Sequence, residues 1–221
     1  MKKILVIAYY WPPSGGSGVQ RWLKFVKYLP SFGIEPHVYT PLNPDFNVQD
    51  SELLKDIPKE AIIVKKKIVE PYGFYRVFVG KKNAKGANVG MINSKKDGLL
   101  QRLAMWIRSN FFIPDPRVFW VRPSTRFLKK YIIKNKIETI ITTGPPHSMH
   151  LIGAAVKRKT GIPWVADFRD PWSEWDVLPQ LLLNNRSWEK HKRLEFEVLN
   201  SADRVLTVSG RLAVALDKLT G

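Results

Sequence analysis

Short apolar segments alternate with helical segments along almost the whole of this 221-residue chain. Most of the apolar segments lack polar alternation, which is typical of parallel strands that helices cover on both faces. Strands are predicted at residues 3–9, 36–40, 61–65, 138–143, 164–167 and 204–209, and helices at residues 19–30, 99–112, 123–135, 148–159, 188–200 and 211–219. This alternation predicts one α/β domain over residues 1–221, with a Rossmann-like, doubly wound and mostly parallel sheet and right-handed crossovers.

The composition excludes several classes of protein. Because the chain has no cysteine, disulfide scaffolds, Cys-ligated zinc sites and thiol nucleophiles are excluded, and a reducing cytosol is compatible. The N-terminal apolar run is short and leads into Trp-Pro-Pro, so it does not predict a signal peptide. No stretch approaches the ~20 apolar residues that span a bilayer. We therefore expect a cytoplasmic protein.

The net charge of +17 is unevenly distributed. Residues 72–160 carry 18 Lys and Arg against three acids, a net +15, which leaves +2 for the rest of the chain. Such a segment predicts an anionic partner: an anionic membrane, a phosphorylated substrate or nucleic acid. No nucleic-acid-binding motif is present, so nucleic acid is not expected. The lysine-rich, glycine-bearing stretch at 80–97 predicts a mobile basic loop.

The stretch YYWPPSGGSGVQRW, residues 9–22, follows the first predicted strand. In an open parallel sheet, ligands bind at the carboxyl ends of the strands. Gly15, Gly16 and Gly18 permit positive φ and close backbone approach, and the helix predicted after them would direct free N–H groups at a phosphate. The loop is neither a dinucleotide fingerprint, since the third glycine and the acidic ribose ligand are missing, nor a Walker A loop. A flexible turn is the structural alternative.

The stretch TTGPPHSMH, residues 142–150, follows the fourth predicted strand. His147 would lie at the ligand edge, where an imidazole can exchange a proton or donate to a phosphate. Ser148 can cap the helix that it opens. The alternative is that each ring only closes a hydrogen bond near the helix start, which we favour for His150.

The stretch VADFRDPW, residues 165–172, crowds three charges at the next strand end. Buried charge is costly unless it is paired or used. Arg169 could clamp a phosphate or carboxylate, and Asp167 or Asp170 could act as a base or orient a sugar hydroxyl. The alternative is a local Arg–Asp ion pair that organises the loop.

Two further stretches concern partners and the cleft. The helix predicted at 99–112 is amphipathic, basic and rich in aromatic residues. Such a helix can lie in a membrane interface, although an apolar stripe more often packs on its own core. The Pro-punctuated turn IPDPRVFW could direct Asp115 or Arg117 toward the cleft.

Taken in order, these stretches resemble the N-terminal domain of family 4 glycosyltransferases, most closely a bacterial surface-polysaccharide branch. The resemblance covers nearly the whole chain and includes GIPWVADFRDPW and the helix before ADRVLTVS. It implies a GT-B fold, in which two Rossmann-like domains face each other across a cleft. The N-terminal domain then binds a glycan or lipid-linked acceptor, and the C-terminal domain binds the nucleotide-sugar with a pair of glutamates. The resemblance also implies a metal-independent, retaining transfer without a cofactor.

The resemblance implies that Gly15 and Gly16 approach the donor diphosphate or the acceptor and that His147 lines the acceptor side. Many family members carry a histidine directly after the strand that here reads PWVADF, whereas this chain has Arg169 there, followed by Asp170. We therefore assign catalytic roles to Asp167, Arg169 and His147. Substrate contacts are assigned to Gly15, Gly16, Gly18, Arg21, Ser148 and Asp170, and no metal site is assigned.

These 221 residues contain no counterpart of the second GT-B domain. We therefore expect the N-terminal half of a larger hexosyltransferase-type enzyme, inactive alone, that works peripherally at the cytoplasmic face of the membrane. The alternative function is a non-catalytic α/β module that binds an anionic ligand, nucleic acid or a membrane surface. An NAD-dependent enzyme is disfavoured because the dinucleotide fingerprint is incomplete.

Overall fold

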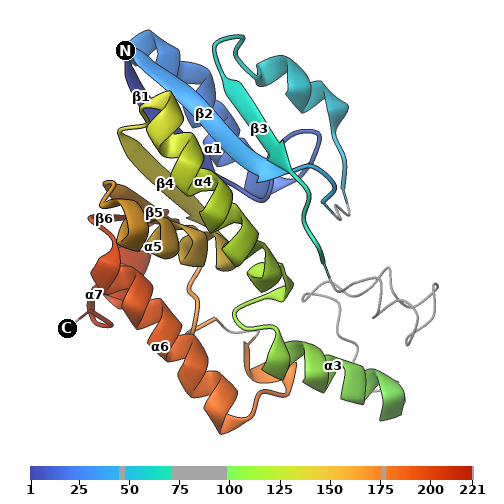
Figure 1. The fold of residues 1–221 in the computed structure, drawn as a ribbon. Coiled ribbons are helices and arrows are strands. Elements are labelled where there is room, and N and C mark those ends of the chain that lie inside the picture. The colour runs from blue at the N-terminus through green and yellow to red at the C-terminus, as the bar shows by residue number, and fades with distance from the viewer. Residues whose placement is uncertain (45–47, 71–98, 176–177, 221) are drawn as a thin grey trace.

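The computed structural model describes residues 1–44, 48–70, 99–175 and 178–220. Within them, six strands form one sheet in the order β3-β2-β1-β4-β5-β6, and every pairing is parallel (Figure 1). The strands are β1 (Lys2–Ile7), β2 (Ile34–Pro41), β3 (Ile62–Lys66), β4 (Thr139–Gly144), β5 (Trp164–Phe168) and β6 (Arg204–Thr207). This confirms the predicted Rossmann-like α/β fold, and the order reverses between β1 and β4.

The helices fill the connections between strands. They are α1 (Ser17–Tyr28), α3 (Leu99–Phe111), α4 (Val121–Asn135), α5 (Ser148–Thr160), α6 (Asn185–Ser201) and α7 (Gly210–Asp217). Short 3₁₀ turns occur at Leu29–Phe32, Ser51–Asp56, Pro116–Trp120 and Leu178–Leu181. Each predicted strand and helix is present, with ends that differ by three residues or fewer. The predicted mobile loop at 80–97 lies outside the described residues.

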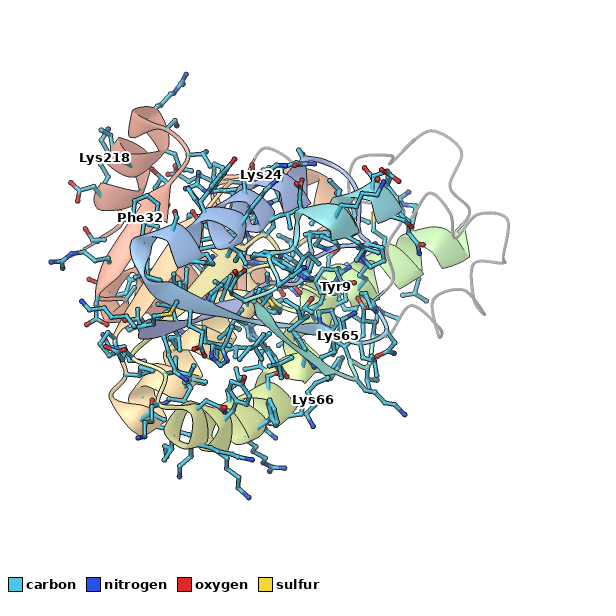
Figure 2. All side chains as sticks on the ribbon, turned by 90° about the horizontal axis from the view of Figure 1, so that it is seen from above. Tyr9, Lys24, Phe32, Lys65, Lys66 and Lys218 are labelled. Carbon is cyan, nitrogen blue, oxygen red and sulfur yellow. The ribbon has the colours of Figure 1, made fainter. Side chains whose placement is uncertain are left out.

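Two apolar clusters hold the layers together. Alternate residues of β1 and the extended residue directly after it enter different clusters, because successive side chains of a strand point to opposite faces. Val6 and Ala8 join Trp22 and Leu23 of α1, whereas Leu5 and Ile7 join the cluster that contains α4 and α5. Tyr9 lies inside this second layer of side chains, and Lys218 lies at the outside of the molecule (Figure 2). The sheet is therefore covered on both faces.

Helix α3 lies off the sheet, on the side toward which the strands point (Figure 1). The side chains of Leu103, Trp106, Ile107 and Phe111 are 52%, 39%, 41% and 66% exposed, whereas the polar Ser109 is buried. For these residues the interpretation that the apolar stripe packs on the protein's own core is wrong.

The attachment of α3 explains this orientation. The side-chain amide of Asn110 donates to the carbonyl oxygen of Leu182 at 3.1 Å, and its oxygen accepts the N–H of Asn184 at 2.9 Å. These hydrogen bonds turn the polar face of α3 toward the segment that precedes α6. The apolar face is consequently left toward solvent.

Candidate functional site

Three loops meet at the carboxyl edge of the sheet, next to the point where the strand order reverses. They follow β1, β4 and β5, and we refer to residues 14–18, 144–148 and 167–173 as the switch-point site. Arg169 joins the three loops, because one guanidinium nitrogen donates to the carbonyl oxygen of Gly18 at 2.9 Å and another donates to that of Pro145. The structure therefore brings the glycine loop, the GPPHS loop and the DFRD segment together.

The three glycines of the first loop are required for different reasons. Gly16 has φ = 88°, in the left-handed region that favours glycine. A Cβ on Gly15 would lie 2.9 Å from a methyl carbon of Val48, and one on Gly18 would lie 3.0 Å from the guanidinium of Arg169. The N–H of Gly15 donates to the carbonyl oxygen of Val48 at 2.9 Å. Gly15 and Gly18 therefore make room for the protein's own groups, and the Gly15 N–H is already bonded.

The start of α1 differs from the starts of α5, α6 and α7. Asn184 caps α6 and Ser209 caps α7 through their side chains, and α5 is capped by Asp115. At α1, Gly16 offers no side chain, and the first turn holds no acidic residue. The Val19 N–H donates to the carbonyl oxygen of Gly16 at 3.4 Å, and the preceding N–H groups of the helix and the positive end of its dipole are not offset by a capping side chain or by an acid in the first turn.

Asp167 is a buried anchor between α1 and the sheet. Its Oδ1 accepts from Nε and Nη2 of Arg21 at 3.2 and 3.0 Å, and its Oδ2 accepts from the Trp22 indole at 2.7 Å and the Thr143 hydroxyl at 2.8 Å. The side chain has no exposed surface. An Arg–Asp ion pair thus exists here, but the arginine comes from α1 and not from the adjacent loop. This geometry favours a positioning role for both Asp167 and Arg21.

Ser148 and Asp115 form a second internal connection. Ser148 is the first residue of α5, and its N–H and hydroxyl both donate to the Asp115 carboxylate, at 2.8 and 2.9 Å. The prediction that Ser148 caps α5 is wrong, because a carboxylate from a distant turn takes that place. Arg117, from the same turn, pairs with Glu70 at 3.0 Å, and both side chains hydrogen-bond with the Tyr9 hydroxyl.

Asp170 is the exposed carboxylate of the switch-point site. It follows Arg169 directly, and no hydrogen bond or ion pair holds its side chain within the described residues. A carboxylate in this position can accept hydrogen bonds from ligand hydroxyls. Of the predicted site residues, Asp170 is thus the acid that remains available.

Two histidines form stacked pairs with aromatic rings beneath the GPPHS loop. His147 stacks on Trp172 with centroids 4.7 Å apart, and His150 stacks on Phe168 at 4.4 Å. The hydroxyl of Thr142 lies 2.8 Å from Nδ1 of His150, so His150 serves the core, as we favoured. Burial lowers the pKa of His150 to about 3 and that of His147 well below its usual value. Both rings are therefore neutral near pH 7.

Unpartnered nitrogens remain on both rings. Nδ1 of His147 and Nε2 of His150 are buried without a hydrogen-bond partner, and a Cβ on Gly144 would lie 3.2 and 2.5 Å from them. His147 itself is only 7% exposed. Its low pKa makes the ring a weak base near neutrality, which favours hydrogen bonding over proton transfer.

Helix α6 supports the ring that His147 contacts. The Trp172 indole donates to Nδ1 of His191 at 3.0 Å, and the Glu195 carboxylate accepts the N–H groups of Trp172 and Ser173 at 3.3 and 2.9 Å. Burial lowers the pKa of His191 to about 4 and raises the pKa of Glu195. Both side chains therefore fix the loop after β5.

Sequence reasoning did not single out Trp22, Thr143, His191 or Glu195. One signal was available, because His191 and Glu195 are four residues apart in a predicted helix and so share one face. When two titratable side chains such as His191 and Glu195 lie on the apolar face of a helix, we expect them to form hydrogen bonds with buried groups of the protein. Within the described residues, no group of three or more His, Asp or Glu side chains is arranged to hold a metal ion. None of the described helices is long and apolar enough to cross a membrane.

Comparison with protein families and with curated proteins finds no match. Among solved structures, the chain is similar to MurG of Acinetobacter baumannii (TM-score 0.47, 16% identity, covering 95% of this chain and 42% of that chain). It is also similar to a glycosyltransferase from Rickettsia africae, with a TM-score of 0.49 and 13% identity over 97% of this chain and 38% of that chain. A third similar structure is Phytolacca americana UGT2, solved with UDP-2-fluoro-glucose and pterostilbene, with a TM-score of 0.41 and 15% identity over 76% of this chain and 30% of that chain. The chain thus spans less than half the length of these proteins.

Proposed function

We propose that this chain is the acceptor-side domain of a GT-B glycosyltransferase of the surface-polysaccharide type. The enzyme would transfer a sugar, with retention of configuration, from a nucleotide-sugar to a glycan or lipid-linked acceptor. The observation that carries the proposal is the start of α1, which no side chain caps and which Arg169 fastens beside the His147 loop. This arrangement suits a diphosphate leaving group next to an acceptor.

The residues take different roles in this proposal. The backbone of Gly16 and Gly18 would approach the diphosphate, and the Arg169 guanidinium behind it would stabilise the negative charge that develops as the nucleotide leaves. Asp170 would orient an acceptor hydroxyl. His147 would contact the acceptor side as a neutral ring.

Asp167, Arg21 and Ser148 would act by positioning, because the structure engages their side chains internally. By the family resemblance, the nucleotide-sugar would be held mainly by a second domain. The 221 residues alone would then bind ligand without turnover, and no metal would be required.

Membrane association at the cytoplasmic face is part of the proposal. The exposed side chains of Leu103, Trp106, Ile107 and Phe111 suit insertion into a lipid interface. Basic residues close to an anionic surface contribute about 1 kcal/mol each, and Arg102 is exposed on the same helix. Flotation with anionic and neutral vesicles tests this, because equal binding that salt does not weaken would contradict it.

The transferase proposal is tested with the protein encoded by the complete reading frame. It would be incubated with radiolabelled UDP-, GDP- and dTDP-sugars and a bacterial lipid extract. We expect transfer that falls about 100-fold in Arg169→Ala, the magnitude typical of a lost transition-state donor, while Lys218→Ala at the distant surface retains it. Salt-sensitive binding of lipid or oligonucleotide without any turnover would instead favour the non-catalytic module.

A further inference from the structure

A groove that belongs to none of the predicted sites lies between the loop after β5 and helix α6. Its volume is about 650 Å³, within the range of small-molecule sites. Its walls include Glu174, Trp175, Trp188, Lys192, Glu195 and Phe196. We refer to this feature as the α6 groove.

The tryptophans of the groove combine partial exposure with an indole N–H that has no acceptor within the described residues, whereas Trp11 in the core lacks an acceptor but is buried. The indole N–H groups of Trp22, Trp120, Trp164 and Trp172 all donate to protein acceptors. In the part of the chain that the structure describes, Trp175 and Trp188 have no such acceptor, and both are partly exposed. These two indoles therefore offer an apolar face and a free donor to a ligand.

The charges of the groove distinguish its ligand from that of the α1 start. Two glutamates and one lysine line the groove, although the whole protein carries +17. A phosphate would be repelled by Glu174, and an acyl chain would desolvate Glu174 and Lys192 at a cost. A neutral ligand with both an apolar face and hydroxyl groups is not repelled by Glu174, and its hydroxyl groups can replace the water around Glu174 and Lys192.

The groove is connected to the switch-point site through two consecutive residues. Trp172 stacks on His147, and Ser173 lines the groove. Glu195 accepts the N–H groups of both residues, so the wall is held rigidly. A ligand in the groove would therefore be adjacent to the candidate acceptor side.

We propose that the α6 groove binds a pyranose ring of a carbohydrate. The C–H face of the sugar stacks on Trp175 or Trp188, its hydroxyls donate to Glu174, and they accept from Lys192 and the indole N–H groups. That this sugar is the acceptor of the transfer rests on the proposed function, whereas its binding does not.

The test uses the 221-residue chain and a panel of methyl glycosides of glucose, galactose, mannose, rhamnose and N-acetylglucosamine. Tryptophan fluorescence is followed during titration, with 1-octanol and inorganic pyrophosphate as comparison ligands. We expect at least one glycoside to bind saturably. Trp175→Ala and Trp188→Ala should each weaken that glycoside about tenfold, as truncation of a central aromatic contact does. Phe32→Ala, an exposed aromatic side chain outside the groove and outside the proposed sites, serves as the matched control.

Conservative variants separate ligand contact from folding. Trp175→Phe and Trp188→Phe keep a stacking face and should retain most of the affinity, and circular dichroism should show unchanged folding. Saturation by octanol but by no glycoside would overturn the proposal in favour of an apolar ligand. Glycoside affinity that neither alanine variant alters would overturn it as well.

Different experimental results would contradict the carbohydrate-binding proposal for the α6 groove and the transferase proposal. If glycosides bind at Trp175 and Trp188 but the full-length protein transfers no sugar, the groove stands and the transferase proposal falls. If transfer occurs with unchanged acceptor KM in both alanine variants, only the groove proposal falls.

Discussion

The starts of α1 and α5 follow neighbouring strands at the switch point, yet only one of them is satisfied from within. At α5, the Asp115 carboxylate binds the N–H and hydroxyl of Ser148. At α1, Gly16 provides no side chain and no acid lies in the first turn. The α5 start is thus stabilised by a side chain of the protein, whereas under the proposed function the backbone donors of the α1 start would bind an anion.

The second turn of α1 stabilises the helix, whose start has no capping side chain. Arg21 and Trp22 both bind Asp167, so the helix is fastened to the sheet one turn beyond the loop. The uncapped start of α1 and the residues that fasten it to the sheet are thus separated along a single helix. Four changes test this comparison, in order of decreasing expected effect.

Asp167→Ala should produce the largest loss of stability. It leaves the Arg21 guanidinium and the Trp22 indole without their acceptor, and breaking a buried ion pair in this way costs about 3–5 kcal/mol. Urea unfolding followed by circular dichroism measures the change. Asp170→Ala is the matched control, since an exposed side chain that makes no hydrogen bond or ion pair within the described residues should change stability by less than about 0.5 kcal/mol. Equal effects of the two variants would refute the anchoring role.

Asp115→Ala should cost about 2 kcal/mol, because the cap of α5 and the hydrogen bond to the Ser148 hydroxyl are both lost. Ser17→Ala, at the first residue of α1, should leave stability nearly unchanged, since that side chain caps nothing. The two variants are compared by urea unfolding. A loss in Ser17→Ala as large as that in Asp115→Ala would mean that the α1 start is capped after all.

The pH dependence of the unfolding free energy tests whether the buried ring of His150 in α5 is shielded from solvent. Because the folded pKa of His150 lies below its ordinary value, the unfolded chain binds the proton first as the pH falls. The contribution of His150 is therefore complete above about pH 6.5 and is lost toward its folded pKa of about 3. Each pH unit well below 6.5 should cost about 1.4 kcal/mol per such histidine.

This slope is measured as the difference between the wild type and His150→Gln. The unfolding free energies of the two proteins are measured at pH 6.0, 5.5 and 5.0. The difference between them should shrink by about 1.4 kcal/mol per pH unit as the pH falls. Parallel curves over that range would show that His150 is accessible to protons in the folded state.

Ser17→Asp should have the smallest effect on stability, with opposite consequences for folding and for binding. A carboxylate in the first turn of α1 should stabilise the fold by about 0.5 kcal/mol through the helix dipole, and it should weaken pyrophosphate binding. Asn200→Asp, in the last turn of α6, is the control and should slightly destabilise the protein without altering binding. Calorimetric titration with pyrophosphate would decide the matter, and undiminished affinity in Ser17→Asp would exclude α1 as the anion site.

Much of the candidate site could be predicted from the sequence, because strand ends and the loops after them are local features. The glycine loop, the GPPHS loop and the DFRD segment were placed at one sheet edge on this basis, and they meet there. The partners of individual side chains could not be predicted. Asp167 pairs with Arg21, 146 positions away, although Arg169 is its near neighbour in sequence.

The orientation of α3 shows the same limit. Its amphipathic pattern is evident in the sequence, but the pattern does not say which face will be covered. Asn110 decides this by binding Leu182 and Asn184, residues more than 70 positions away. The structure consequently exposes the face that periodicity alone would bury.

The sequence by itself determined the alternation of strands and helices, the fold class and the positions of the glycine-rich and charged loops, since apolar periodicity and turn chemistry act over a few residues. Only the tertiary structure decided the strand order, the cap that Asp115 provides for α5, the internal use of Asp167 and the free indoles of the α6 groove. These depend on which distant segments the packed sheet brings within hydrogen-bonding distance, and that information is not local to any stretch of the chain.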